Sequence, residues 1–145
     1  TALRLQIPID LEFLQKCLQN ILQNNTDDNA SLKIQITRGE TQRGYAFPDN
    51  LAPNYTLFLA EANPFLVDNW SDGIKVRVCD LTLSSNPALA GLKHLNRLEN
   101  ILARAEWKNE FAEGLLLDQT GHLIEATMSN IFLVKNHQLI TPDLH

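Results

Sequence analysis

Apolar and polar positions in the first part of the chain follow the spacing of one helix and two strands. Helical spacing over residues 14–22 predicts a helix, with Asp10 as its N-cap and the polar run 24–29 as its end. Its apolar positions are Leu14, Cys17, Leu18, Ile21 and Leu22. Residues 32–36 alternate between apolar and polar side chains, which predicts a half-buried strand. Residues 55–60 are almost entirely apolar, which is typical of a central strand.

The second part of the chain begins after a cluster of turn residues at 63–73, which we interpret as a linker. Residues 74–79 alternate between apolar and polar side chains and predict another strand. Residues 84–87 predict a turn or a short helix start. Helical spacing from Leu95 onward then predicts a long helix that ends near Glu110.

Two hairpins are expected near the end of the chain. The first joins residues 115–117 to 123–125 across an Asp-Gln-Thr-Gly turn. The second joins residues 131–134 to 138–141 across an Asn-His turn. Together with the preceding helix, these hairpins predict antiparallel strands in the second part and an α/β (α+β) protein as a whole.

Composition narrows the class of protein. Hydrophobic residues make up 44% and charged residues 20% of the 145 residues, which is a globular balance. The net charge is -5 and the basic residues are scattered, which argues against nucleic acid as a partner. No apolar run approaches the ~18 residues of a membrane span, and no signal pattern opens the chain. We therefore expect no membrane association and a cytoplasmic location.

The cysteines and histidines show no metal or disulfide pattern. Cys17 and Cys79 are isolated, which indicates thiols in a reducing compartment. The four histidines lack metal-ligand spacing with each other or with the cysteines, so no metal site is predicted.

Lys93 is a candidate nucleophile. It lies between the predicted turn and the long helix, with apolar Leu92 and Leu95 nearby and Gly91 before them. Burial disfavours the charged form of a lysine, and a neutral amine can form a Schiff base with a carbonyl. The alternative is an ordinary surface lysine, which is the commoner case for lysines in general.

Glu125 is a second candidate, at the end of an apolar strand. Hydroxyl side chains follow it at Thr127 and Ser129, where they could line a polar cavity. The alternative is a solvent-facing glutamate followed by an ordinary turn.

Taken together and in order, these segments resemble the fold-type IV enzymes that use pyridoxal 5′-phosphate (PLP). That family includes aminodeoxychorismate lyases and the branched-chain and D-amino-acid aminotransferases. Its E-x-x-x-S-N-(I/L)-F motif is matched by residues 125–132. The lyase branch's N-P-x-L-A-G-(I/L)-K-H-L-N-R-L run is matched by residues 86–98, and its R-G-x-x-x-R-G-Y loop is similar to residues 38–45. The resemblance makes Arg43 and Tyr45 of that loop candidates for binding a substrate carboxylate, because a guanidinium fork suits that group; a solvated loop is the alternative.

The resemblance implies a role for each matching residue. Lys93 would form the Schiff base with PLP and later move a proton, and Glu125 would keep the pyridine nitrogen protonated. Thr127 and Ser129 would lie near the cofactor. Arg97, one helical turn past Lys93, is expected in a supporting ion pair.

The resemblance also implies an architecture and a reaction. Residues 1–65 would belong to a small N-terminal α/β lobe, and residues 66–145 to a C-terminal PLP-binding lobe with a helix and antiparallel pseudo-barrel strands. The reaction would convert 4-amino-4-deoxychorismate to 4-aminobenzoate and pyruvate, with a homodimer as the expected assembly. An aminotransferase of the same family and a non-catalytic relative are the alternatives.

The ends of the chain bear on cofactor binding. The chain opens on Thr1 and stops just after a strand-like run, so we expect a fragment that lacks N- and C-terminal parts of the enzyme. In the family, an upstream arginine and a downstream turn bind the PLP phosphate. We therefore expect this fragment to bind PLP weakly or not at all.

Overall fold

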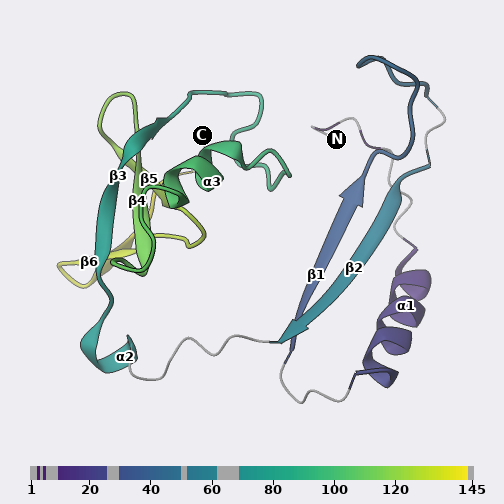
Figure 1. Cartoon of the computed structure of the whole chain (residues 1–145), viewed down its shortest axis with the longest axis horizontal. Helices are drawn as coiled ribbons and strands as arrows, with labels where there is room; N and C mark the ends of the chain where they lie inside the picture. Colours follow the sequence, from purple (N-terminus) through teal and green to yellow (C-terminus); the bar gives the residue numbers. More distant parts are fainter. Residues whose placement is uncertain are drawn as a thin grey trace. The chain divides into compact units, whose positions relative to one another are not determined.

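The computed structural model describes residues 3, 5, 10–25, 30–49, 52–61 and 69–143 (Figure 1). The chain divides into two compact units, Thr1–Phe65 and Leu66–His145. Most of the predicted linker lies outside the described residues, which resume at the short helix α2 (Asn69–Asp72). The assignment of the two units to lobes of a larger enzyme stays a prediction.

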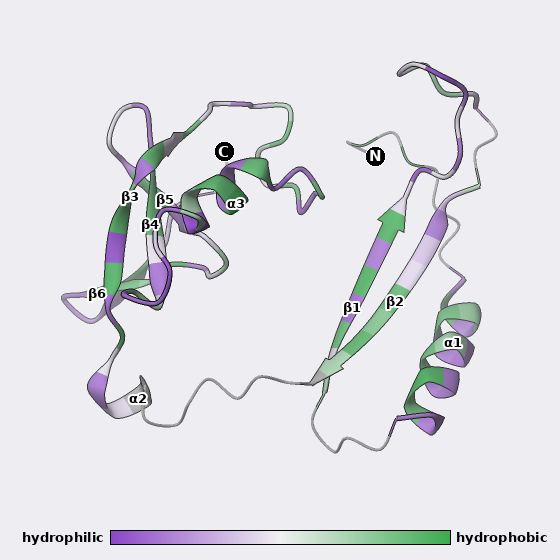
Figure 2. Cartoon of the chain, in the orientation of Figure 1, coloured by the Kyte–Doolittle hydropathy of each residue, from purple (hydrophilic) through white to green (hydrophobic). Residues whose placement is uncertain are grey.

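The first helix, α1 (Leu11–Gln23), forms where the apolar spacing predicts it. The side chain of Asp10 accepts a hydrogen bond from the Phe13 backbone N–H at 3.0 Å, which confirms Asp10 as the N-cap. The helix ends at Asn24, whose N–H bonds the carbonyls of the preceding turn. Hydrophobic and hydrophilic residues alternate along it (Figure 2), so one stripe of the helix can pack against a sheet.

That sheet consists of β1 (Ala30–Thr37) and β2 (Asn54–Glu61), paired antiparallel. Both strands were predicted. Among the described residues β2 pairs with β1 alone, and the interpretation of residues 55–60 as a central strand stays a prediction. One helix packed against β2 cannot cover both faces of a two-stranded sheet. Leu32 and Ile34 therefore remain 37% and 47% exposed, where a half-buried strand was expected.

The second unit is built on a three-stranded sheet in the order β3 (Val76–Leu83), β4 (Glu113–Asp118) and β5 (Leu123–Ala126). β4 and β5 form the predicted antiparallel hairpin, but β3 and β4 run parallel. The predicted antiparallel pairing is confirmed for this hairpin, whereas the parallel pairing of β3 with β4 was not predicted. Parallel neighbours need a long crossover connection, and the segment that contains α3 (Leu98–Arg104) supplies it.

The core of this unit lies where α3 packs against β3 and β4. It consists of Cys79, Ala103, Trp107 and Leu116, with Leu81, Leu83 and Phe111 packed around them. β4 lies so close to Trp107 that a Cβ added to Gly114 would meet the indole ring at 2.5 Å and the Cys79 sulfur at 2.6 Å. Only glycine fits there, and this close packing fixes the start of β4.

Helix α3 is much shorter than predicted. It ends at Arg104 and not near Glu110, because the chain turns there to place Trp107 in the core. The Arg104 guanidinium donates to the carbonyls of Trp107 at 2.9 Å and Lys108 at 3.2 Å, which stabilises the turn. The buried residue of the helix is Ala103, whereas Leu98 and Leu102, from the predicted apolar stripe, are 60% and 51% exposed.

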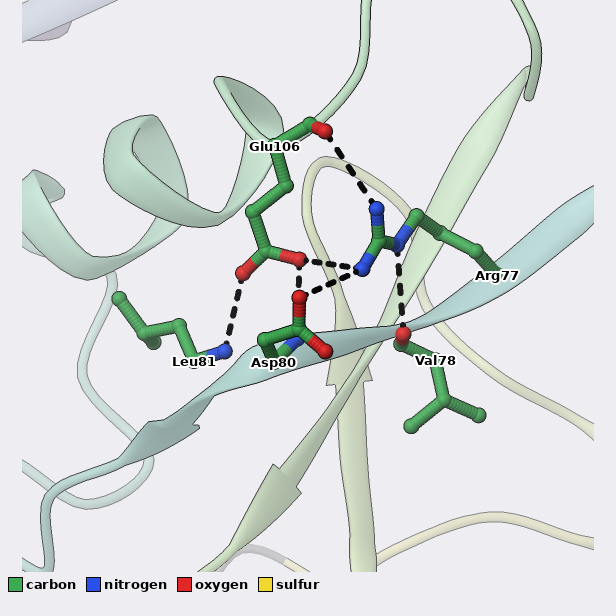
Figure 3. Close-up of polar contacts among 5 residues, drawn as sticks. All are labelled: Arg77, Val78, Asp80, Leu81 and Glu106. Atoms are coloured by element: carbon green, nitrogen blue, oxygen red, sulfur yellow. Dashed lines mark hydrogen bonds and ion pairs between the residues drawn. The ribbon is translucent and has the colours of Figure 1, made fainter.

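Glu106, just after α3, joins this turn to β3 (Figure 3). Its carboxylate accepts the backbone N–H groups of Asp80 at 2.8 Å and Leu81 at 2.9 Å. It also pairs with the Arg77 guanidinium at 2.9 Å, and both side chains are about four-fifths buried, with exposed fractions of 17% and 20%. Both side chains of the pair also bond backbone groups, so we interpret the pair as a support for the crossover and not as a ligand site.

The remaining strands, β6 (Leu133–Lys135) and β7 (Gln138–Ile140), form the second predicted hairpin. Asn136 and His137 both have positive φ, at 51° and 61°, as its two-residue turn requires. None of the helices in the described part of the chain has the length and apolar character needed to cross a membrane.

Candidate functional site

Glu125 lies on β5, opposite Leu116 of β4, and is half-buried. Its Oε1 atom accepts a hydrogen bond from Asn100 Nδ2 of α3 at 2.9 Å and lies 3.8 Å from Arg97 Nη1. This ion pair matches the supporting role expected for Arg97. Within the described residues Oε2 has no partner. Glu125 is therefore oriented through one oxygen, while the other can accept a hydrogen bond from a ligand.

Asn100 ties Glu125 to the turn that follows β5. Its Nδ2 atom also donates to the Thr127 backbone carbonyl at 3.2 Å. The turn itself is closed by the Ala126 N–H, which donates to the Ser129 carbonyl at 3.1 Å. A single amide group thus connects α3, the strand end and the turn.

Glu113, at the start of β4, is the functional candidate that the sequence did not reveal. It is only 4% exposed and accepts hydrogen bonds from the hydroxyl of Thr127 and, at 2.8 Å, from that of Ser129. It also accepts the backbone N–H groups of Met128 at 3.3 Å and Gly114 at 2.9 Å. A charged residue opening the buried run of β4 was the available signal, but no motif marks it.

Burial and hydrogen bonding act in opposite directions on Glu113. Burial alone raises the pKa of a carboxyl group, because it disfavours the charged form. The donors of Thr127, Gly114, Ser129 and Met128 together outweigh burial and leave the pKa of Glu113 below its ordinary value of 4.5. Glu113 is therefore a buried, ionised and fully hydrogen-bonded carboxylate.

Lys93 lies in the second unit, between a turn and α3. The Leu92 N–H donates to the Leu89 carbonyl at 3.1 Å and closes this turn. The turn lies just after residues 84–87, where a turn or a short helix start was predicted. Lys93 is exposed and forms no hydrogen bond or ion pair with any residue of the described ranges. Of the two apolar neighbours that the sequence gives it, Leu92 is half-buried and Leu95 is 57% exposed. Its role stays a prediction.

The structure brings only some of the predicted residues together. Glu125, Thr127 and Ser129 share one network in the second unit. Arg43 and Tyr45 lie in the first unit, in a bend where the Tyr45 side chain is fully exposed, so their proposed contact with substrate stays a prediction. Across the described ranges, no group of three or more His, Cys, Asp or Glu side chains is arranged to hold a metal ion.

The chain is similar to known proteins of one family. A family model described as "Amino-transferase class IV" matches residues 1–145. The chain is 38% identical over 120 residues to an aminodeoxychorismate lyase of Vibrio harveyi, covering 81% of this chain and 44% of that protein. It is 30% identical over 138 residues to branched-chain-amino-acid aminotransferase-like protein 1 of Arabidopsis thaliana, covering 94% of this chain and 25% of that protein.

A solved structure shares the fold. The crystal structure of 4-amino-4-deoxychorismate lyase from Pseudomonas aeruginosa matches with a TM-score of 0.80 and 40% identity, over 97% of this chain and 52% of that one. The predicted mixed α/β fold and the resemblance to this family are confirmed. The chain spans about half the length of that structure and less than half of the Vibrio protein.

Proposed function

Because the chain belongs to the amino-transferase class IV family, we propose that its full-length protein is a PLP-dependent aminodeoxychorismate lyase. The reaction would split 4-amino-4-deoxychorismate into 4-aminobenzoate and pyruvate. The similarity to the Vibrio and Pseudomonas proteins, both named for this lyase, supports the choice within the family.

The observation that carries the proposal is the state of Glu125. A half-buried carboxylate with one oxygen held by Asn100 and the other without a described partner is suited to accept a ligand N–H. A protonated pyridine nitrogen is such a donor, and its positive charge would be opposite to that of the carboxylate. The donor set therefore fits PLP, and Glu125 would hold the ring nitrogen.

Lys93 would hold the cofactor through its ε-amine. The side chain is exposed and forms no bond with a described residue, so no contact has to be broken before it reacts. PLP, when bound, supplies an electron sink for a carbanion formed next to the substrate nitrogen. Once released by substrate, the neutral amine of Lys93 would take the proton from the substrate ring.

The substrate itself needs positioning more than activation. Loss of a ring proton and departure of the enolpyruvyl oxygen leave an aromatic ring, so the elimination runs downhill. Arg43 and Tyr45 are proposed to bind a substrate carboxylate, the arginine by a two-pronged charge-assisted contact. A homodimer in the cytoplasm, with no metal, is the expected form of the protein.

The alternative within the family is an aminotransferase, which the 30% identity to the Arabidopsis protein supports. Two assays on the full-length protein separate the activities. Pyruvate released from 4-amino-4-deoxychorismate without an amino acceptor identifies the lyase. Transfer of the amino group of a branched-chain or D-amino acid to 2-oxoglutarate, without pyruvate release from aminodeoxychorismate, would overturn the proposal in favour of the aminotransferase.

A non-catalytic relative is tested by the visible absorbance of the same protein with added PLP. A lyase should show a visible band that borohydride abolishes and that Lys93→Ala removes. Lys108→Ala is a matched control, because Lys108 is an exposed lysine of the same unit outside the candidate site. If the band is absent, or if Lys93→Ala retains it, the proposed enzyme is excluded.

A further inference from the structure

We propose that Glu113 is a positioning residue that sets the orientation of Glu125 through Thr127 and Asn100. The three hydrogen-bonded steps of this path all lie within the second unit. Its meaning for cofactor binding rests on the proposed function, but the path itself can be tested without a cofactor.

The first step is the attachment of the turn to Glu113. Each carboxylate oxygen of Glu113 accepts two donors, Thr127 Oγ1 and the Gly114 N–H on Oε1, and Ser129 Oγ and the Met128 N–H on Oε2. All four bonds are charge-assisted, and the two on Oε1 are buried, so they are stronger than neutral bonds. Since both oxygens are occupied, Glu113 acts through the turn and has no capacity left to bind a ligand.

The second step runs through Thr127, which is bonded at three points. Its hydroxyl donates to Glu113, its backbone N–H donates to the Gly114 carbonyl at 3.0 Å, and its carbonyl accepts from Asn100. Thr127 is also buried, with 9% of its surface exposed. The position of its carbonyl is therefore determined by the start of β4.

The third step is the amide of Asn100. Its two partners, the Thr127 carbonyl and Glu125 Oε1, both accept hydrogen bonds, so the NH₂ group must face them. The two N–H bonds of one planar amide have a fixed angle between them. A displacement of the Thr127 carbonyl therefore rotates the amide and displaces the hydrogen bond that orients Glu125.

The same contacts limit what Thr127 and Ser129 can do. Both hydroxyl hydrogens point toward Glu113, so toward any ligand these two oxygens can only accept. Phosphate oxygens are acceptors as well. We therefore infer that neither hydroxyl donates to the PLP phosphate, and that both residues serve the site by holding the turn.

The test is Glu113→Gln in the full-length protein without PLP, observed by NMR. The readout is the Asn100 side-chain amide signal, identified by its loss in Asn100→Asp. Glu113→Gln keeps the size of the side chain but replaces one acceptor oxygen by a donor. We expect the Asn100 signal to shift toward that of an exposed asparagine, and the Met128 N–H to exchange with solvent about tenfold or more faster.

Glu110→Gln is the matched control. Glu110 is an exposed carboxylate of the same unit that accepts two backbone N–H groups, from Lys108 and Asn109, but has no bond to the turn. It should leave the Asn100 signal in place. If Glu113→Gln frees the Met128 N–H but leaves Asn100 unchanged, the path is refuted.

Thr127→Val covers the case in which Glu113→Gln does not fold, as judged by tryptophan fluorescence. It replaces the hydroxyl by a methyl group of similar size and should shift Asn100 in the same direction by a smaller amount; an unshifted signal in folded Thr127→Val overturns the path. Added PLP separates the two proposals. If the wild-type protein binds no PLP, the proposed function fails while the Asn100 result still decides the role of Glu113; if it does bind, we expect about tenfold weaker affinity in Glu113→Gln.

Discussion

Glu113 and Glu125, on the neighbouring strands β4 and β5 of the second unit, have contrasting environments. Glu113 is 4% exposed and its two oxygens accept four donors. Glu125 is half-buried, and only its Oε1 atom is bonded within the described ranges. A saturated carboxylate can stabilise a fold but cannot take a ligand, whereas a partly bonded one can do so without losing its orientation. We therefore expect Glu113 to contribute mainly to stability, and the chemical role is proposed for Glu125.

Activity should separate the two regions most strongly. Glu125→Ala in the full-length protein is expected to lower the kcat of pyruvate release by about a hundredfold to a thousandfold, because the cofactor ring would lose its charge partner. Steady-state kinetics with 4-amino-4-deoxychorismate measures this loss. Glu110→Ala, which removes an exposed carboxylate of the same unit, serves as the control. A loss of less than about threefold in Glu125→Ala would contradict the role given to Glu125.

Stability should show the reverse order. Glu113→Ala leaves two hydroxyl groups and the Met128 N–H without their acceptor, so we expect it to lower the free energy of unfolding by about 2–4 kcal/mol. Glu125→Ala should cost only about 1 kcal/mol or less, because its partners can reach water. Urea unfolding followed by tryptophan fluorescence gives both values. Equal losses in the two variants would remove the distinction between the regions.

The pH dependence of unfolding should sharpen the comparison. The pKa of Glu113 is lowered in the folded state, so its contribution to stability is present above its ordinary value of 4.5. That contribution is lost as the pH falls through the lowered value, since protonation then removes the charged acceptor. Urea unfolding at a series of pH values from 7 down to about 3 should therefore show a smaller decline for Glu113→Gln than for the wild type. Parallel curves for the two proteins would contradict the ionised state of Glu113.

The smallest effect is expected for Arg97, whose guanidinium lies 3.8 Å from Glu125. Both side chains are 37% exposed, and water and salt screen such a pair. Arg97→Met should lower the free energy of unfolding by only about 0.2–1 kcal/mol, and 0.5 M NaCl should reduce the difference from wild type. A loss above about 2 kcal/mol would show that Arg97, and not Asn100, is the main group that orients Glu125.

Local signals in the sequence were sufficient for the elements that form from adjacent residues. Asp10 caps α1 because its side chain reaches an N–H three residues away. The Asn136–His137 turn closes a hairpin because both residues accept positive φ. The motif after Glu125 identified the right strand end, although the roles predicted for Thr127 and Ser129 are now proposed to be structural. Prediction failed where residues distant in the chain decide the outcome, as at the end of α3.

Patterns in the sequence were enough to identify the family, the hairpins, the first helix with its cap, and Lys93 and Glu125 as candidates. The folded structure was needed to show that β3 and β4 run parallel, that α3 stops where Trp107 enters the core, and that Glu113 supports the turn beside Glu125. The difference follows from the range of the interactions. Capping and turn formation depend on neighbours in the sequence, whereas burial of a carboxylate depends on donors 14 to 16 positions away.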